Sequence, residues 1–193
     1  MNTLEDRLLV EAVVAGEKQA FCQLVEQFQR LVSHIVFQIV SEREDREDLC
    51  QEVFMKVYKH ISSFEYQSKL STWIGRIAYN ASLNYLQKKR IPLVADLVDS
   101  SAASVDSFAS ENVLPDEFAR RSDVAAILRR HINCLQPQYR TIVTLYHLDD
   151  MSYHEIAEIT GLPDGTVKSH LFRARKQLRE SLSKHYTREE LCA

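Results

Sequence analysis

Glycine, proline and cysteine are all scarce in this chain of 193 residues, which has four of each. So few glycines and prolines leave little material for the many tight turns of an all-β protein. The cysteines, at positions 22, 50, 134 and 192, lie far apart and form no CxxC pair. This spacing favours small apolar fillers in a reducing cytoplasm over a disulfide framework.

Long apolar runs are also missing, because no segment approaches the roughly 18 apolar residues that a membrane span needs. The first seven residues include Glu5 and Asp6 and lack the residue order of a signal peptide. We find no glycine-rich phosphate loop and no nucleophile–base pattern. His131 and Cys134 are three residues apart, a spacing that metals use, but His131 lies on an apolar stripe and is expected in the core. The sequence therefore predicts a cytoplasmic protein that is not an enzyme and has no membrane insertion, cofactor or metal.

Charge of one sign is concentrated in blocks that the net charge of −3 conceals. Residues 41–52 carry a net charge of −4, and residues 91–116 have five acids and no base. Residues 69–90 have five bases and no acid, and residues 164–188 carry a net charge of +5. Two separate basic blocks indicate two contacts with a polyanion.

Helical periodicity dominates the first half of the chain. We expect a first helix capped by Thr3 and ended by Gly16, a long amphipathic helix through Ile39, a third over residues 45–61 and a fourth over residues 72–89. The third helix would bury Leu49, Val53, Val57 and Ile61. Residues 62–71 are predicted to form a loop.

A serine-rich, acidic segment divides the chain into two predicted helical domains. We expect domain boundaries at residues 1–91 and 116–193, with Pro92 ending the first domain and residues 92–115 forming a flexible linker. The second domain would contain a helix through Leu135, another from Pro137 to about His147, and the segment that follows. The predicted fold class is thus all-α, with two small domains.

Residues 151–182 have the pattern of a helix-turn-helix. Ser152 followed by Glu155 is a capping box, and Gly161 lies where the short helix must stop. The next helix would bury Val167, Leu171, Ala174, Leu178 and Leu182. Its opposite side would present Ser169, Phe172, Arg173 and Lys176, flanked by Lys168 and Arg175. Hydroxyl, aromatic and cationic groups of this kind suit a DNA major groove, although a solvated basic surface is the plain alternative.

This second half resembles region 4 of sigma factors, and of the small extracytoplasmic-function (ECF) class in particular. The resemblance lies in Leu135-Gln136-Pro137, Arg140, residues 151–157, residues 165–169, residues 173–175 and Leu178-Arg179. It implies recognition of the −35 promoter element by Lys168, Ser169, His170, Phe172, Arg173 and Lys176. His170 stands where many relatives carry arginine, which implies a different or pH-dependent −35 preference.

Residues 45–54 resemble sigma region 2.2, which docks on the clamp helices of the RNA polymerase β′ subunit. By this resemblance Asp48, Gln51 and Glu52 form the contact with polymerase. An acidic helix surface of this kind pairs with cationic side chains on a partner. A solvated acidic helix start is the alternative.

Residues 64–74 and the helix after them are similar to sigma regions 2.3 and 2.4, which open and bind the −10 element. Unpaired bases stack on aromatic side chains while a basic groove follows the backbone. The implied DNA-binding residues are Phe64, Lys69, Trp73, Arg76, Asn80, Asn84 and Lys88. Trp73 and Asn80 also have structural interpretations, in the core and in hydrogen bonds within the domain. The loop at residues 65–68 lacks the glycine often found in relatives.

The resemblance covers residues 8–90 and 116–182. It implies an alternative sigma factor that binds core RNA polymerase at the β′ clamp helices and the β flap, binds promoter DNA and is sequestered by an anti-sigma factor. One alternative is a stand-alone helix-turn-helix regulator, but this alternative assigns no role to residues 64–90. Another is a protein-binding adaptor that has lost DNA recognition.

Overall fold

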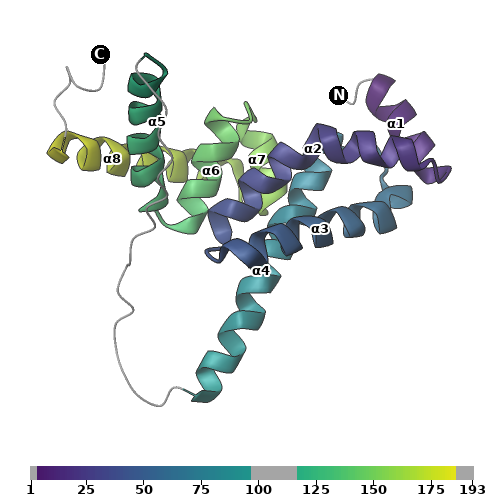
Figure 1. Cartoon of the computed structure of the whole chain (residues 1–193), viewed down its shortest axis with the longest axis horizontal. Helices are drawn as coiled ribbons and strands as arrows, with labels where there is room; N and C mark the ends of the chain where they lie inside the picture. The colour runs from purple at the N-terminus through teal and green to yellow at the C-terminus, as the bar shows by residue number, and fades with distance from the viewer. Residues whose placement is uncertain (1–3, 97–116, 186–193) are drawn as a thin grey trace.

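The computed structural model describes residues 4–96 and 117–185, which contain helices and no strands. The predicted all-α class with two small helical domains is confirmed. The N-terminal unit consists of α1 (Leu4–Val14), α2 (Lys18–Ile39), α3 (Arg43–His60), the 3-10 turn η1 (Ile61–Ser63) and α4 (Leu70–Asp96). The C-terminal unit consists of α5 (Glu117–Asn133), α6 (Pro137–His147), α7 (Tyr153–Thr160) and α8 (Asp164–His185) (Figure 1).

Helix α2 is the centre of the N-terminal unit because its apolar residues recur every three or four positions. This spacing places them on a broad stripe that packs against α1, α3 and α4. Its fully buried members include Leu24, Val32, Ile35 and Val36. Helix α3 packs on this stripe with Leu49, Val53 and Val57 buried, and the fourth predicted residue, Ile61, is buried in the turn η1. The fold of the first domain thus follows from its periodicity.

The end of α4 differs from the prediction. We expected the helix to stop near Lys89 and Pro92 to end the domain, but α4 continues through Pro92 to Asp96. Proline deprives a helix of one hydrogen bond without preventing helical dihedrals in the residues that follow. The first five residues of the predicted linker therefore belong to α4. Thr3, Cys192 and the remainder of the linker lie outside the described residues.

The helix-turn-helix forms as its sequence predicts. Ser152 Oγ accepts from the backbone N–H of Glu155, and the Glu155 carboxylate accepts from the backbone N–H of Ser152 at 2.9 Å. Helix α7 ends at Gly161, which has a φ of 72°, a left-handed conformation that costs a glycine little. The chain then turns within three residues into α8, the second helix of the motif.

The two units are in direct contact, which the sequence did not predict. Helix α2 packs against α6, and α4 packs against α7. Figure 1 shows the C-terminal unit seated on one end of α2 while the later part of α4 projects away from both units. The contact brings together segments that are more than a hundred residues apart, such as His34 and Asp149.

Two further features concern membranes and metals. None of the described helices combines the length and the apolar character that crossing a membrane requires. Within residues 4–96 and 117–185, no group of three or more histidine, cysteine or acidic side chains lies close enough together to hold a metal ion. His131 instead lies 2.7 Å from the Ser181 hydroxyl, joining α5 to α8.

Replacing Ser152 with alanine removes one half of the capping box. We expect the free energy of unfolding to fall by about 1 kcal/mol, the usual cost of losing an N-cap side chain. Urea unfolding followed by circular dichroism measures the change. Ser183→Ala is the matched control, because that exposed hydroxyl bonds only to the carbonyl of Glu180 in its own helix. Equal stability of the two variants would contradict the importance of the cap.

Candidate nucleic-acid interface

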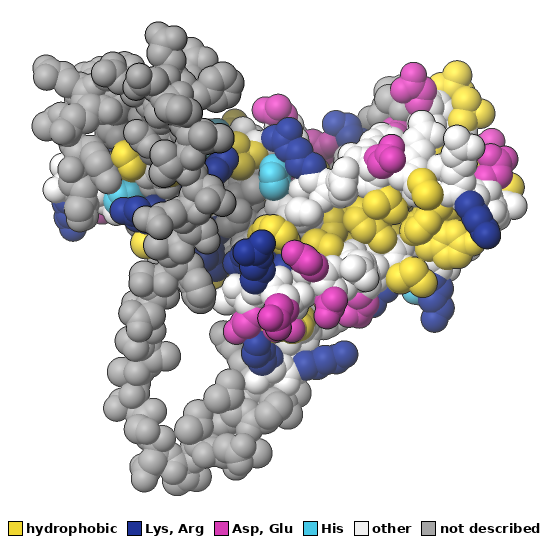
Figure 2. All heavy atoms as spheres, in the orientation of Figure 1, with side chains coloured by type: hydrophobic (Ala, Val, Ile, Leu, Met, Phe, Trp, Pro, Cys, Tyr) yellow, Lys and Arg dark blue, Asp and Glu magenta, His cyan; other side chains and the backbone are white. Residues whose placement is uncertain are grey.

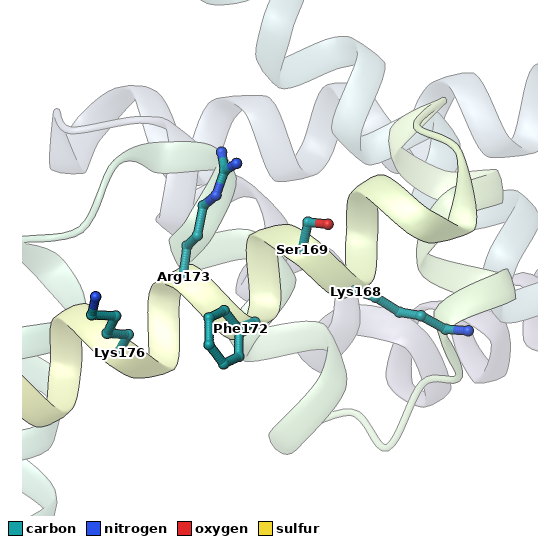
Figure 3. Close-up of a pocket in the computed structure, with 5 residues that line it drawn as sticks. All are labelled: Lys168, Ser169, Phe172, Arg173 and Lys176. Carbon is teal, nitrogen blue, oxygen red and sulfur yellow. The ribbon is translucent and has the colours of Figure 1, made fainter.

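The outer side of α8 presents five of the six residues that the sequence assigned to the −35 element. Val167, Leu171, Ala174 and Leu178 are buried, and this inner stripe turns the opposite side outward. Five side chains line one shallow, open depression there, a surface that we call the α8 face: Lys168, Ser169, Phe172, Arg173 and Lys176. Figure 3 shows them projecting from a single stretch of α8, which is about 12 Å long at 1.5 Å per residue.

Phe172 is the least expected member of the α8 face, because 70% of its surface is exposed. Burial of a phenylalanine stabilises a fold by roughly 1.5–3 kcal/mol, so this residue makes little contribution to the stability of its own domain. It is flanked by the cationic side chains of Arg173 and Lys176. An exposed aromatic ring between cations offers an apolar contact to a thymine methyl beside donors for guanine edges and phosphates.

His170 lies differently from the other predicted residues. It is half-buried, with its ring edge-on to Tyr139 at 5.1 Å between centroids, and its Nδ1 is buried without a hydrogen-bond partner. Residue 170 follows Val167 by three positions and precedes Ala174 by four, so it shares the inner side of the helix. The structure therefore does not place His170 on the α8 face.

A ladder of rings and cations borders the α8 face. Tyr146 of α6 and Tyr153 of α7 stack at 5.2 Å, with an angle of 17° between their planes. Lys168 lies 5.5 Å from the centre of the Tyr153 ring, and Arg175 lies 5.1 Å from that of Tyr146. Arg175 also donates to Nε2 of His147. Cations held over aromatic rings in this way keep an ordered position at the surface.

Helix α4 carries a second polar surface, the α4 stripe, formed by Arg76, Asn80, Asn84 and Lys88. All four are exposed and recur every four residues, so they form one line along the helix. Ile74, Ala78 and Tyr79 face inward and hold the helix against the core. Asparagine amides both donate and accept, which allows them to recognise base edges as well as backbone groups.

The aromatic residues before the α4 stripe form a packed cluster. Phe64 contacts both Tyr66, at 4.8 Å, and Trp73, at 5.4 Å between ring centroids. Phe64 and Trp73 are buried, with 9% of Trp73 exposed, and Tyr66 is half-buried with a φ of 57°. Trp73 therefore has the core position that was one of its two interpretations, and the cluster fixes the loop that leads into α4.

Lys69 is the predicted residue whose position differs most from expectation. Its Nζ lies 2.7 Å from a carboxylate oxygen of Glu155, the capping-box residue of the other unit. Burial alone would raise the pKa of Glu155, but the bonds from Lys69 and Ser152 outweigh it and lower the pKa. Lys69 is thus paired within the protein, although about half of its side chain is still exposed.

The acidic helix α3 divides into two surfaces. Asp48, Gln51 and Glu52 are exposed on one side, and Glu52 pairs with Lys56 at 2.7 Å. Figure 2 shows acidic side chains gathered over the start of α3 with basic side chains beside them. The exposed carboxylates of Asp48 and Glu52 remain at the surface, where a cationic partner can reach them.

The other acidic residues at the start of α3 bond to side chains of α4. Tyr85 donates to Asp45, and Lys89 lies 3.0 Å from Glu42 and 3.3 Å from Asp45. The bond from Tyr85 is the main cause that lowers the pKa of Asp45, and the bond from Lys89 is the main cause for Glu42. Lys89 therefore joins α4 to the start of α3, whereas Lys88 belongs to the exposed α4 stripe.

Sequence reasoning missed the residues that join the two units, namely Arg30, His34, Asp149 and the Lys69–Glu155 pair. His34 was the one visible signal, because a histidine lies beside the apolar stripe of α2. The Tyr146–Tyr153 ladder was also missed, since ring stacking between helices leaves no periodic pattern.

Comparison with protein families gives two matches. Residues 24–91 match the family model for sigma-70 region 2, and residues 125–178 match that for sigma-70 region 4. The first contains the α4 stripe and all of α3, and the second contains the α8 face. Together the two matches cover more than half of the chain.

Curated relatives extend over almost the whole chain. The ECF RNA polymerase sigma-E factor of Haemophilus influenzae is 36% identical over 93% of this chain and 96% of its own. The ECF RNA polymerase sigma-E factor of Escherichia coli K12 is 37% identical over 91% of this chain and 93% of its own. Sigma factor SigW of Bacillus subtilis is 28% identical over 90% and 94%.

Solved structures show the same fold. The sigma factor RpoE of Bartonella quintana, crystallised with the anti-sigma factor NepR, is 26% identical with a TM-score of 0.63 over 86% of this chain and 98% of its own. CnrH, solved in complex with the cytosolic domain of CnrY, is 20% identical with a TM-score of 0.64 over 94% of this chain and 99% of its own.

Replacing Trp73 with alanine separates a structural role from surface recognition. We expect Trp73→Ala to lower the free energy of unfolding by about 3–5 kcal/mol, because it leaves a cavity beside Phe64. Arg76→Ala, on the neighbouring exposed stripe, should change it by less than about 0.5 kcal/mol. Urea unfolding measures both variants. A small effect at Trp73 would show that its ring does not support the loop.

Proposed function

Because this chain belongs to the ECF family of RNA polymerase sigma factors, we propose that it binds core RNA polymerase and directs it to specific promoters. The observation that carries the proposal is the presence of two separate polar surfaces, the α4 stripe and the α8 face, on units that match sigma regions 2 and 4. A stand-alone helix-turn-helix regulator would account only for the second. We propose that the protein acts by binding, without catalysis, in the cytoplasm where polymerase operates.

The α8 face is the proposed contact with the −35 element. Arg173 would take a guanine edge with two hydrogen bonds, Phe172 would meet a thymine methyl, and Lys168 and Lys176 would contact phosphates. Ser169 donates its hydroxyl to the Gly165 carbonyl at 2.9 Å, so its oxygen remains able to accept. His170 is left out, because its half-buried ring packs against Tyr139.

The α4 stripe is the proposed contact with the −10 element. Asn80 and Asn84 would recognise bases, and Arg76 and Lys88 would follow the phosphates of the separated strand. Since Phe64 and Trp73 are buried, we propose that they shape the loop before α4 as a pocket wall instead of serving as open stacking platforms.

Contacts with two partners, core polymerase and an anti-sigma factor, complete the proposal. Asp48, Gln51 and Glu52 would dock on the β′ clamp helices, and the C-terminal unit on the β flap. An anti-sigma factor would bind the protein and hold it inactive. The Bartonella quintana relative, which was crystallised with its anti-sigma factor NepR, supports this partner through its 26% identity and its structural match over 86% of this chain.

Neutralising the centre of the α8 face tests promoter recognition. We expect Arg173→Ala with Lys176→Ala to lower run-off transcription from a cognate promoter by at least about tenfold, since a base-reading arginine contributes about 1–3 kcal/mol. The matched control is Arg129→Ala with Arg130→Ala, which removes the same charge from exposed positions on α5. Equal activity of the two double variants would contradict the assignment. Failure of the wild-type protein to support transcription with core polymerase would contradict the function itself.

Charge reversal on α3 tests the polymerase contact. Asp48→Arg should weaken binding to core polymerase by about tenfold or more, because it opposes like charges across the docked surface. Glu26→Arg, an equal change at an exposed position of α2, should leave the affinity unchanged. Fluorescence anisotropy of labelled protein titrated with core polymerase measures both. Parallel losses in the two variants would show a nonspecific effect of charge.

A further inference from the structure

The loop that leads into α4 contains a tyrosine with a left-handed backbone. Tyr66 has a φ of 57°, and the sequence has no glycine at residues 65–68. Among the described residues other than glycine, one more, Asp150, has a positive φ. Aspartate tolerates this conformation because its short polar side chain can bond to the nearby backbone, whereas a bulky side chain is strained there. A strained conformation of this kind persists only where the surrounding groups fix it.

The ring of Tyr66 contacts both an aromatic and a cationic side chain. Phe64, which is buried and contacts Trp73, lies 4.8 Å from it between ring centroids. The guanidinium carbon of Arg7 lies 5.3 Å from the ring centre, within the range of a cation–π interaction. Phe64 belongs to the loop itself, whereas Arg7 comes from α1. The contact of Arg7 therefore ties the loop to a different helix.

The residues on either side of Tyr66 remain at the surface. Glu65 and Gln67 are exposed, and Nε2 of Gln67 donates to a carboxylate oxygen of Glu65 at 2.8 Å. At the start of the loop, the backbone N–H of Phe64 donates to the carbonyl of Ile61 at 3.1 Å. These bonds before and across the strained residue leave the loop few conformations, and the half-buried ring of Tyr66 is the part that reaches α1.

Helix α1 is a firm support for this contact. It packs against α2 and against the turn η1, which directly precedes the loop, and it buries Val10 and Val13. Gln27 of α2 donates to Asp6, the residue before Arg7, at 3.5 Å. Arg7 itself is exposed and is no part of the core, so a change of its side chain leaves the packing of α1 intact.

The loop that Arg7 supports lies beside the proposed −10 contact. It joins Phe64 to the start of α4, and Phe64 and Trp73 are the proposed pocket wall. A base that leaves the stack needs a pocket to enter, and a loop with several conformations must be ordered at the moment of binding. Arg7 lies outside residues 24–91, which match the sigma-70 region 2 model, and outside the α4 stripe.

We propose that Arg7 of α1 is a positioning residue for the −10 contact and that it acts through Tyr66. Its guanidinium holds the ring against Phe64, maintains the left-handed turn and so keeps the loop in the shape that receives unpaired bases. The inference rests on the proposed function, and it extends the −10 site to a helix that the family match does not include. A loop that is already ordered in the free protein avoids the cost of ordering it when the strands separate.

Binding of a single strand measures the effect of Arg7. The preassembled holoenzyme would be titrated into a fluorescein-labelled DNA single strand that carries the −10 element of a cognate promoter, with anisotropy as the signal. We expect Arg7→Gln to weaken binding by about 2–5-fold, the contribution of an exposed cation–π interaction. Arg7→Lys keeps a cation over the ring and should bind like the wild type. The matched control, Lys18→Gln, removes a positive charge from an exposed position of α2 and should also bind like the wild type. Unchanged binding by Arg7→Gln, or an equal loss in Lys18→Gln, would overturn the proposal.

A second substitution distinguishes action through Tyr66 from a direct contact of Arg7 with DNA. Glycine adopts the left-handed conformation without strain, so Tyr66→Gly removes both the ring and the need to hold it. In the Tyr66→Gly background we expect Arg7→Gln to cause no further loss of affinity, because two residues that act as a pair are not additive. An undiminished loss in that background would show that Arg7 acts independently of Tyr66, on the phosphates themselves, and would refute the positioning role.

The fluorescence of Trp73 reports on the loop without polymerase. It is the only tryptophan of the chain, it is 9% exposed, and it contacts Phe64. We expect acrylamide to quench it about twofold more strongly in Arg7→Gln than in the wild type or Lys18→Gln, because a loosened loop admits the quencher. Equal quenching in all three proteins would contradict the proposal. If the quenching responds but the wild-type holoenzyme never binds the −10 strand, the proposed function is refuted, and with it the −10 role of Arg7, but not the support of the loop by α1.

Discussion

The close approach of α4 and α7 at Gly75 is the constraint on which the arrangement of this protein depends. A glycine there allows Ile159 to reach within contact distance of the backbone of α4 and of Ile35 on α2. That single point joins the core of the N-terminal unit to the first helix of the helix-turn-helix. The flanking bonds of Lys69 and His34 follow from it, because they lie beside the same two helices of the N-terminal unit.

The two proposed nucleic-acid surfaces lie away from this contact because of their positions on their helices. Each carrier helix buries one stripe and turns the opposite side outward, so the α4 stripe and the α8 face stay exposed while the two units are in contact. Lys69 precedes the stripe and pairs with Glu155 at the contact between the units, with about half of its side chain exposed.

Periodicity was sufficient to predict what depends on one helix at a time. The buried residues of α2 and α3, the capping box at Ser152 and the outward side of α8 all follow from local spacing, and all are confirmed. The predicted end of α4 near Lys89 was wrong, because a proline near the end of a helix does not always terminate it. His170 was predicted from the resemblance alone, and its ring lies half-buried against Tyr139 because residue 170 shares the inner side of α8 with Val167 and Ala174. Contacts between units have no periodic signature, so Glu155 was assigned to the cap and its second bond, to Lys69, was missed.

The distance between the two units is the most direct measure of this account. Fluorophores attached at Gln67→Cys and Gln177→Cys, both exposed positions, would report it by single-molecule energy transfer once the native cysteines are replaced by serine. In the free protein the labels should lie within about 50 Å, given the Lys69–Glu155 contact between the units and the helix lengths on either side of it. A substantially longer distance would contradict the account.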